Sequence, residues 1–278
     1  MPGSEPKRNL TAVAARLADA VRSAGALALE ASRNPVKSWV KGQNSPVSEV
    51  DIAVDALLKV RLEAIMPEAA WLSEETEDDP RRLSARRVWI VDPIDGTRAF
   101  LAGRADWTVS VALVEDGRPI VAALYAPASE EFFLAVAGTG VTRNGLAIRA
   151  SAGEALAGAR ISGPKRLLDQ IAAAAPDVII EPRVHSLALR LARVADNTLD
   201  AALAGGDSHD WDLAAADLLV HEAGGALTTL EGATLSYNSA TPTHGMLVAA
   251  GRPRHQALRT LLCSSDAHRV DDLAHPAG

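Results

Sequence analysis

Two carboxylates stand three residues apart where an apolar stretch of the chain ends in a glycine turn. Asp92 and Asp95 offer the oxygen ligands that Mg²⁺, Mn²⁺ and Ca²⁺ prefer, whereas zinc or copper sites normally recruit His or Cys. Pro93 fixes one backbone angle and Gly96 permits a positive φ, so the chain can turn sharply here. Such a turn can direct both carboxylates and the Ile94 carbonyl into one space. The spacing therefore indicates metal-assisted chemistry.

The next residues add a possible anion site. If a short helix opens at Thr97 and runs through Phe100, the backbone N–H groups of Gly96, Thr97 and Arg98 can bind a phosphate beside the metals. The alternative is an ordinary turn, because Asp-Pro-x-Asp-Gly is good turn chemistry by itself.

Two further acidic clusters favour the functional interpretation. Glu74 and Glu75 follow the apolar run 70–72, and Asp212 follows Trp211 just before a helical pattern over 213–223. Alone, the first cluster would be a solvated loop and the second a helix N-cap. Three acidic clusters in this order form a known pattern.

The chain resembles the inositol monophosphatase superfamily of Mg²⁺-dependent, lithium-sensitive phosphatases. The resemblance covers nearly the whole chain. It is carried by Ser45-Pro46-Val47-Ser48-Glu49-Val50-Asp51, Trp71-Leu72-Ser73-Glu74-Glu75-Thr76, the run from Trp89 to Phe100, Asn144-Gly145, and Trp211-Asp212 with Glu222-Ala223-Gly224-Gly225.

The resemblance implies a role for each matching residue. It makes Mg²⁺ the cofactor, with two or three ions in each site. The metal ligands implied are Glu74, Asp92, the Ile94 carbonyl, Asp95 and Asp212, with Asp92 as the bridge. The catalytic residues implied are Glu74, Thr97 and Asp51, of which Asp51 orients Thr97 while Thr97 and Glu74 position the attacking water. The substrate contacts that we expect are Gly96, Thr97, Arg98, His185 and Ser186.

The same resemblance implies an α+β fold, a layered αβαβα sandwich. We expect an N-terminal subdomain over 1–151 that carries most metal ligands, a C-terminal αβ subdomain over 152–263 that supplies Asp212, and a frayed tail over 264–278. Apolar periodicity predicts helices over 10–31, 50–66, 164–173 and 187–194, and strands over 109–114, 120–125, 132–136, 159–161, 178–180, 198–202 and 226–230. Residues 37–44 read as a strand or a mobile loop.

Composition agrees with an enzyme that acts on a small metabolite. At 278 residues and 48% hydrophobic, the chain can bury a large core. Its net charge of −7 argues against binding nucleic-acid polymers or membrane surfaces. The single cysteine, Cys263, cannot form an internal disulfide, and neither a signal-peptide pattern nor an apolar run of about 18 residues is present. We therefore expect a cytoplasmic protein, and the family resemblance suggests a homodimer.

The substrate is less clear than the reaction. The segments 71–76, 95–100 and 107–110 look most like bacterial 3'(2'),5'-bisphosphate nucleotidases, which implies hydrolysis of adenosine 3',5'-bisphosphate to AMP and phosphate. Inositol enzymes place a glutamate seven residues before the last metal aspartate, where this chain has Gly205. Relatives commonly have glycine where this chain has His185. Arg98, Lys165 and Arg183 could neutralise a second phosphate, although solvated surface positions are the ordinary interpretation of each.

Other functions have weaker support. Inositol 1-phosphate is the second candidate substrate, followed by histidinol phosphate. A non-catalytic metal-binding protein would lack a ligand, and none is missing. The segment Gly206-Asp207-Ser208-His209-Asp210 hints at a serine-hydrolase turn, but Asp210 replaces the final glycine.

Overall fold

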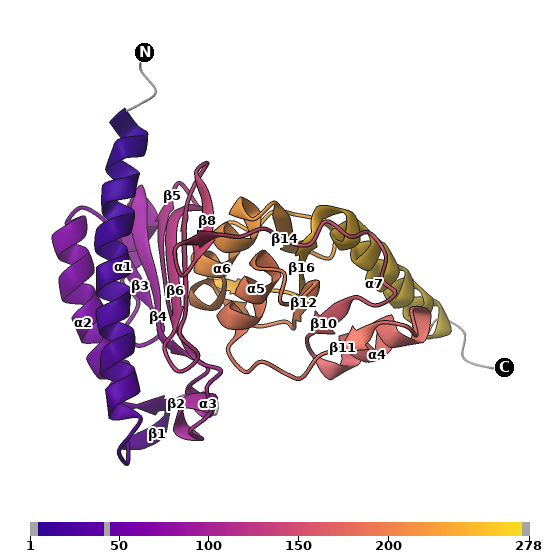
Figure 1. The fold of residues 1–278 in the computed structure, drawn as a ribbon, viewed down its shortest axis with the longest axis horizontal. Helices are drawn as coiled ribbons and strands as arrows, with labels where there is room; N and C mark the ends of the chain where they lie inside the picture. Colours follow the sequence, from indigo (N-terminus) through magenta and orange to yellow (C-terminus); the bar gives the residue numbers. More distant parts are fainter. Residues whose placement is uncertain (1–4, 42–44, 274–278) are drawn as a thin grey trace.

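The computed structural model describes residues 5–41 and 45–273. These residues fold into five layers (Figure 1). The layers follow in this order: an outer pair of helices, a seven-stranded sheet, a middle pair of helices, a five-stranded sheet and a second outer pair of helices. The outer helices at one end are α1 (Glu5–Ala31) and α2 (Glu49–Ile65), the middle ones are α5 (Leu187–Ala195) and α6 (Asp210–Glu222), and those at the other end are α4 (Lys165–Ala174) and α7 (Arg252–Leu273). The predicted α+β class and αβαβα sandwich are confirmed.

The first two helices follow their apolar periodicity. Leu17 and Val21 of α1, together with Val54 and Leu58 of α2, are fully buried against the seven-stranded sheet. Helix α2 begins after Ser48, whose hydroxyl caps the first turn, and ends just before Pro67, as the sequence predicts. Between these helices, β1 (Ser38–Lys41) and β2 (Ser45–Ser48) form an antiparallel pair. The expected strand or loop over 37–44 is therefore a strand through Lys41, and residues 42–44 lie outside the described residues.

The seven-stranded sheet carries most of the site. Its strands run in chain order and all neighbours are antiparallel except the first pair, β3 and β4. They are β3 (Ala70–Ser73), β4 (Arg87–Asp95), β5 (Thr108–Glu115), β6 (Arg118–Ala126), β7 (Glu131–Val136), β8 (Gly140–Arg143) and β9 (Leu146–Ala147). A short helix, α3 (Thr97–Leu101), follows β4 directly, and a 3₁₀ helix, η1 (Pro80–Ser84), precedes it.

The five-stranded sheet has mixed topology in the order β11-β10-β12-β16-β14. Its strands are β10 (Arg160–Ser162), β11 (Ile179–Ile180), β12 (Ala201–Ala204), β14 (Gly225–Thr229) and β16 (Leu247–Gly251), and a separate pair is formed by β13 (Ser208–His209) and β15 (Thr243–His244). The sequence did not reveal β16, although this strand lies between β12 and β14 and is fully buried. Five apolar or small residues give no period by which a strand can be distinguished from a helix segment.

The two sheets share one core. Leu124 of the first sheet, Leu219 of α6 and Ala249 of the second sheet belong to the same cluster of buried side chains. The connection between the sheets spans residues 148–159, around the predicted subdomain boundary at 151. The middle helices therefore hold the two halves of the chain together where ligands from both halves must meet.

The C-terminal tail over 264–278 was expected to fray, and this expectation stays a prediction. The backbone stays helical in α7 through Leu273, and residues 274–278 lie outside the described residues. Within residues 5–41 and 45–273, none of the helices has the length and apolar character needed to cross a bilayer.

Candidate active site

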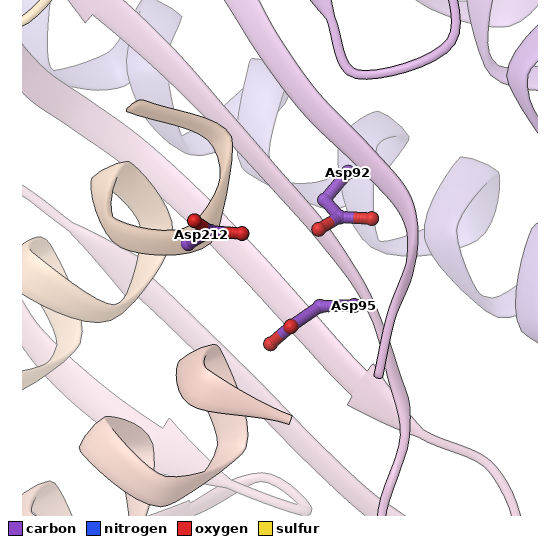
Figure 2. Close-up of side chains that lie close together, drawn as sticks. All are labelled: Asp92, Asp95 and Asp212. Carbon is purple, nitrogen blue, oxygen red and sulfur yellow. The ribbon is translucent and has the colours of Figure 1, made fainter. Parts of the chain in front are cut away.

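Three aspartates from two halves of the chain converge between the layers. Asp92 and Asp95 lie at the end of β4, and Asp212 projects toward them from the first turn of α6 (Figure 2). Each offers a carboxylate oxygen, and these oxygens all lie within 4.8 Å of one another. A register shift in the β4–β5 pairing falls between Asp92 and Asp95, which lets both side chains reach the same space.

The carboxylate of Asp92 has no hydrogen-bond partner among the described residues. Both of its carboxylate oxygens are buried and unpaired, and the residue is 1% exposed. Burial, reinforced by the negative charges of Glu74 and Asp95, raises the pKa of Asp92 well above its usual range. An unpartnered buried carboxylate costs free energy unless a cation compensates it. The all-oxygen donor set and the orphaned Asp92 therefore fit a hard divalent cation.

Asp95 is held by the start of α5. One of its oxygens accepts hydrogen bonds from the Ser186 hydroxyl at 2.6 Å and from the Ala188 N–H at 2.6 Å. Ser186 is fully buried, and its hydroxyl also accepts the Leu189 N–H as the N-cap of α5. The Ser186 hydroxyl thus faces Asp95 and the helix, and Ser186 is not among the residues that line the cavity, so its expected substrate contact stays a prediction.

Asp212 is fixed by its own helix. The structure starts α6 at Asp210, three residues earlier than the helical pattern at 213 indicated, so Asp212 lies in the first turn. Its carboxylate accepts the His209 N–H at 2.7 Å. Burial, followed by the charge of Asp95, raises the pKa of Asp212 well above its usual range. The positive end of the helix dipole partly offsets that penalty.

Glu74 lines the same side of the site from the loop after β3, outside the group of three aspartates, and Lys41 lies against it. The Lys41 ammonium group is 3.3 Å from a Glu74 carboxylate oxygen, 2.6 Å from a Glu75 carboxylate oxygen and 3.1 Å from the Glu74 carbonyl. Burial raises the pKa of Glu74 to about 7 even though Lys41 lowers it. Sequence reasoning missed Lys41, because a lysine five residues before a proline gave no sign that β1 would fold back onto the Glu74 loop.

Asp51 and Thr97 form the second part of the expected catalytic group. The Thr97 hydroxyl lies 3.2 Å from an Asp51 oxygen and 3.0 Å from the Ile94 carbonyl, so its single proton can go to either acceptor. The other Asp51 oxygen accepts the Ser48 N–H and hydroxyl at 2.9 and 2.5 Å. Asp51 is buried behind Thr97, as an orienting role requires.

A cavity of about 320 Å³ opens in front of these groups. It brings together most of the predicted site residues, and its walls are Pro46, Glu74, Asp92, Ile94, Asp95, Gly96, Thr97, Arg98, Arg183, His185 and Asp212. Gly96 has φ of +94°, and a Cβ there would approach the Asp106 carbonyl and the Ser186 nitrogen to 3.2 Å. Only glycine therefore lets α5 approach the metal-site turn this closely.

His185 lies at the mouth of this cavity and is fixed by Asp106. The Asp106 carboxylate accepts the His185 N–H at 2.8 Å and lies 2.7 Å from its Nδ1. Burial tends to raise the pKa of Asp106, but hydrogen bonds from His185 and Arg104 bring it down to about 2. Asp106 is a second residue that the sequence analysis missed, because only the approach of α5 to the loop after α3 makes it part of the site.

The chain belongs to the inositol monophosphatase family, whose sequence profile matches residues 8–267. A 3'-phosphoadenosine 5'-phosphate phosphatase of Mycobacterium leprae is 38% identical over 209 residues, covering 69% of this chain and 73% of the relative. The solved structure of the extragenic suppressor protein SuhB of Bartonella henselae superimposes with a TM-score of 0.78 at 27% identity, covering 90% of this chain and 98% of that one. Family, fold and site thus define a metal-dependent phosphatase.

The names of other relatives do not agree on one substrate. An inositol-1-monophosphatase of Rhizobium meliloti is 34% identical over 202 residues, covering 69% of this chain and 75% of the relative. A Streptomyces griseus protein named glucose-1-phosphate thymidylyltransferase is 39% identical over 204 residues, covering 69% of this chain and 76% of the relative. Overall similarity therefore leaves the substrate to be argued from the cavity.

Proposed function

We propose that this protein is a Mg²⁺-dependent phosphomonoesterase that prefers adenosine 3',5'-bisphosphate and releases AMP and phosphate. The observation that carries the phosphatase assignment is the convergence of three aspartates around the unpaired, buried carboxylate of Asp92. Asp92, Asp95, Asp212, Glu74 and the Ile94 carbonyl would hold two or three Mg²⁺ ions. Bound divalent cations neutralise phosphoryl charge and make water a better nucleophile at neutral pH.

The protein's own groups would position the attacking water. When the Thr97 hydroxyl donates to Asp51, its lone pairs are left to accept a hydrogen bond from a water molecule in the cavity. The Glu74 carboxylate lines the same cavity and can accept the other hydrogen of that water, as the one general base that takes its proton on attack. The turn at Gly96 and Thr97, with Arg98, would bind the phosphate oxygens in line with this water. Lys41 would orient Glu74.

The case for a bisphosphate rests on the charge beside the cavity. A second cavity of about 780 Å³ is lined by Arg104, Arg160, Arg183 and Arg193, against Asp106 and Glu181 as its only acidic lining residues in the described part of the chain. Arg183 lines both cavities. Arg104, Arg160 and Arg193 pair with Asp106, Asp200 and Glu131. We find no such pair for Arg183 within residues 5–41 and 45–273, so it is the guanidinium best placed to meet a second phosphate.

One of the relatives and Gly205 favour the same substrate. The M. leprae relative is named for the adenosine bisphosphate class of substrate, and Gly205 follows β12 without a side chain that could bind sugar hydroxyls. Inositol 1-phosphate is the second candidate.

Phosphate release tests the proposal directly. In the presence of Mg²⁺, kcat/KM is measured for four substrates, each with and without Li⁺: adenosine 3',5'-bisphosphate, inositol 1-phosphate, fructose 1,6-bisphosphate and histidinol phosphate. We expect the nucleotide to be the best substrate. A preference for inositol 1-phosphate would replace the substrate assignment but keep the phosphatase, and no release from any of the four would refute the proposed function.

A further inference from the structure

Helix α2 carries a second buried carboxylate, one turn beyond Asp51. Asp55 is 7% exposed and lies four positions after Asp51, so both side chains lie on the same face of the helix. Asp51 faces Thr97, whereas Asp55 faces the loop after β3 that carries Glu74. Neither oxygen of Asp55 is used for helix capping, and no role described so far requires a carboxylate here.

Both oxygens of Asp55 accept hydroxyl groups from the two ends of that loop. The Ser73 hydroxyl donates to one oxygen at 2.5 Å, and the Thr76 hydroxyl donates to the other at 2.6 Å. Glu74 and Glu75 stand between these two donors. The carboxylate therefore fixes both ends of a four-residue loop whose middle residues reach the proposed metal site and Lys41.

The two hydroxyls have partners of their own, which closes the network. The Ser73 oxygen accepts the Glu75 N–H at 3.3 Å, and the Thr76 oxygen accepts the indole N–H of Trp71 at 3.2 Å. Because each hydroxyl proton is used by Asp55, each hydroxyl oxygen is directed to accept from the loop or from β3. Removing the carboxylate would leave the buried Ser73 hydroxyl and the half-buried Thr76 hydroxyl without this acceptor and release the loop backbone.

We infer that Asp55 is a positioning residue that holds the Glu74 loop in the geometry needed to bind the cations, acting through the hydroxyls of Ser73 and Thr76. Outer partners of metal ligands commonly change metal affinity or activity 10- to 100-fold when they are mutated. One face of α2 thereby orients both groups proposed to position the water, Thr97 through Asp51 and Glu74 through Asp55. This inference concerns the site's geometry and does not depend on which phosphate ester is the substrate.

The test uses the full-length protein with Asp55→Asn, which keeps the shape but loses the charge and can accept only one hydroxyl proton. We expect the Mg²⁺ concentration for half-maximal phosphate release to rise about 10-fold or more. The Kd for Mn²⁺, measured by electron paramagnetic resonance of the free ion without substrate, should rise in parallel. Glu63→Gln, an exposed acid on the same helix, is the matched control and should change neither value.

Partner variants separate positioning from a general loss of stability. Thr76→Val and Ser73→Ala each remove one hydroxyl but leave the α2 charge in place, so each should shift the Mn²⁺ Kd in the same direction as Asp55→Asn. The Asp55→Asn/Thr76→Val double variant should shift it no further than the larger single change, because the two residues act through one contact. Unchanged Mn²⁺ affinity in Asp55→Asn, with only a lower Tm, would overturn the inference. If Asp55→Asn does not fold, unchanged Mn²⁺ affinity in both hydroxyl variants would overturn it equally.

Discussion

The two walls of the active-site cavity are built in different ways. On one wall, Asp92, Asp95 and Asp212 crowd three negative charges together. Among the described residues no lysine or arginine forms an ion pair with these three aspartates, although the guanidinium of Arg190 offsets part of the charge of Asp95. On the other wall, Arg98, Arg183 and His185 are exposed. The crowded aspartates need a cation to compensate their charge, and a bound cation would determine the type of reaction. The exposed side chains can be changed with little effect on folding, so they can determine which substrate binds.

Among the changes proposed here, Asp92→Asn, which alters the buried wall, should have the largest effect on activity. We expect a loss of Mg²⁺-dependent phosphate release of at least about 1,000-fold, since the proposed bridging ligand is lost. The metal-free variant should melt no lower than the wild type, because one of several repelling charges is gone. The rise in Tm on adding Mg²⁺ should disappear. Thermal melts with EDTA and with Mg²⁺ measure this, Glu63→Gln is the control, and retained turnover would refute the bridge assignment.

Ser186→Ala tests whether Ser186 belongs to the buried wall, as the structure indicates. Loss of the hydrogen bond to Asp95 should reduce kcat about 10- to 100-fold and raise the Mg²⁺ requirement. Loss of the helix N-cap should also cost about 1 kcal/mol of stability. Ser186→Thr keeps the hydroxyl and should recover most of the activity. If only KM rises in Ser186→Ala, the result would instead support the substrate contact that the sequence predicted for Ser186.

Arg183→Gln probes the exposed wall. Adenosine 3',5'-bisphosphate and adenosine 3'-monophosphate present the same reacting phosphate and differ only in the second one. We expect kcat/KM for the bisphosphate to fall about 10-fold, as for one charge-assisted hydrogen bond, while the value for the monophosphate stays the same. Arg61→Gln on the exposed side of α2 is the control. An equal fall for both substrates would show that Arg183 does not recognise the second phosphate.

The pH dependence of stability should show the smallest effect and sharpen the same contrast. Burial raises the folded-state pKa of Asp92, Asp212 and Glu74, the last to about 7. The folded protein without metal therefore binds more protons than the unfolded chain above about pH 4, so stability falls as pH rises toward 7 and beyond. In EDTA, Tm should drop by at least about 3 °C between pH 5.5 and 8, a change that corresponds to about 1 kcal/mol for a chain of this size.

Saturating Mg²⁺ is the control for this pH series. Bound cations stabilise the charged carboxylates and should abolish the decrease. A Tm in EDTA that rises over the same interval would contradict the raised pKa values.

The sequence by itself determined the elements and ligands that depend on local chemistry. Strand β4 ends at Asp95 just before Gly96, whose φ is positive, and α2 ends just before Pro67, so short-range patterns sufficed for these. The family motifs likewise marked the three aspartates before their proximity was visible. Such residues are predictable because their neighbours along the chain fix their conformation.

Tertiary structure alone decided which side chains face one another. Lys41 meets Glu74 across 33 residues, Asp55 meets Ser73 across 18, and Ser186 meets Asp95 across 91. No local pattern encodes these pairs, since they arise where β1, α2 and α5 pack around the end of β4. The same packing buries the Ser186 hydroxyl against Asp95, a proposed metal ligand, because Gly96 allows α5 to approach the turn closely.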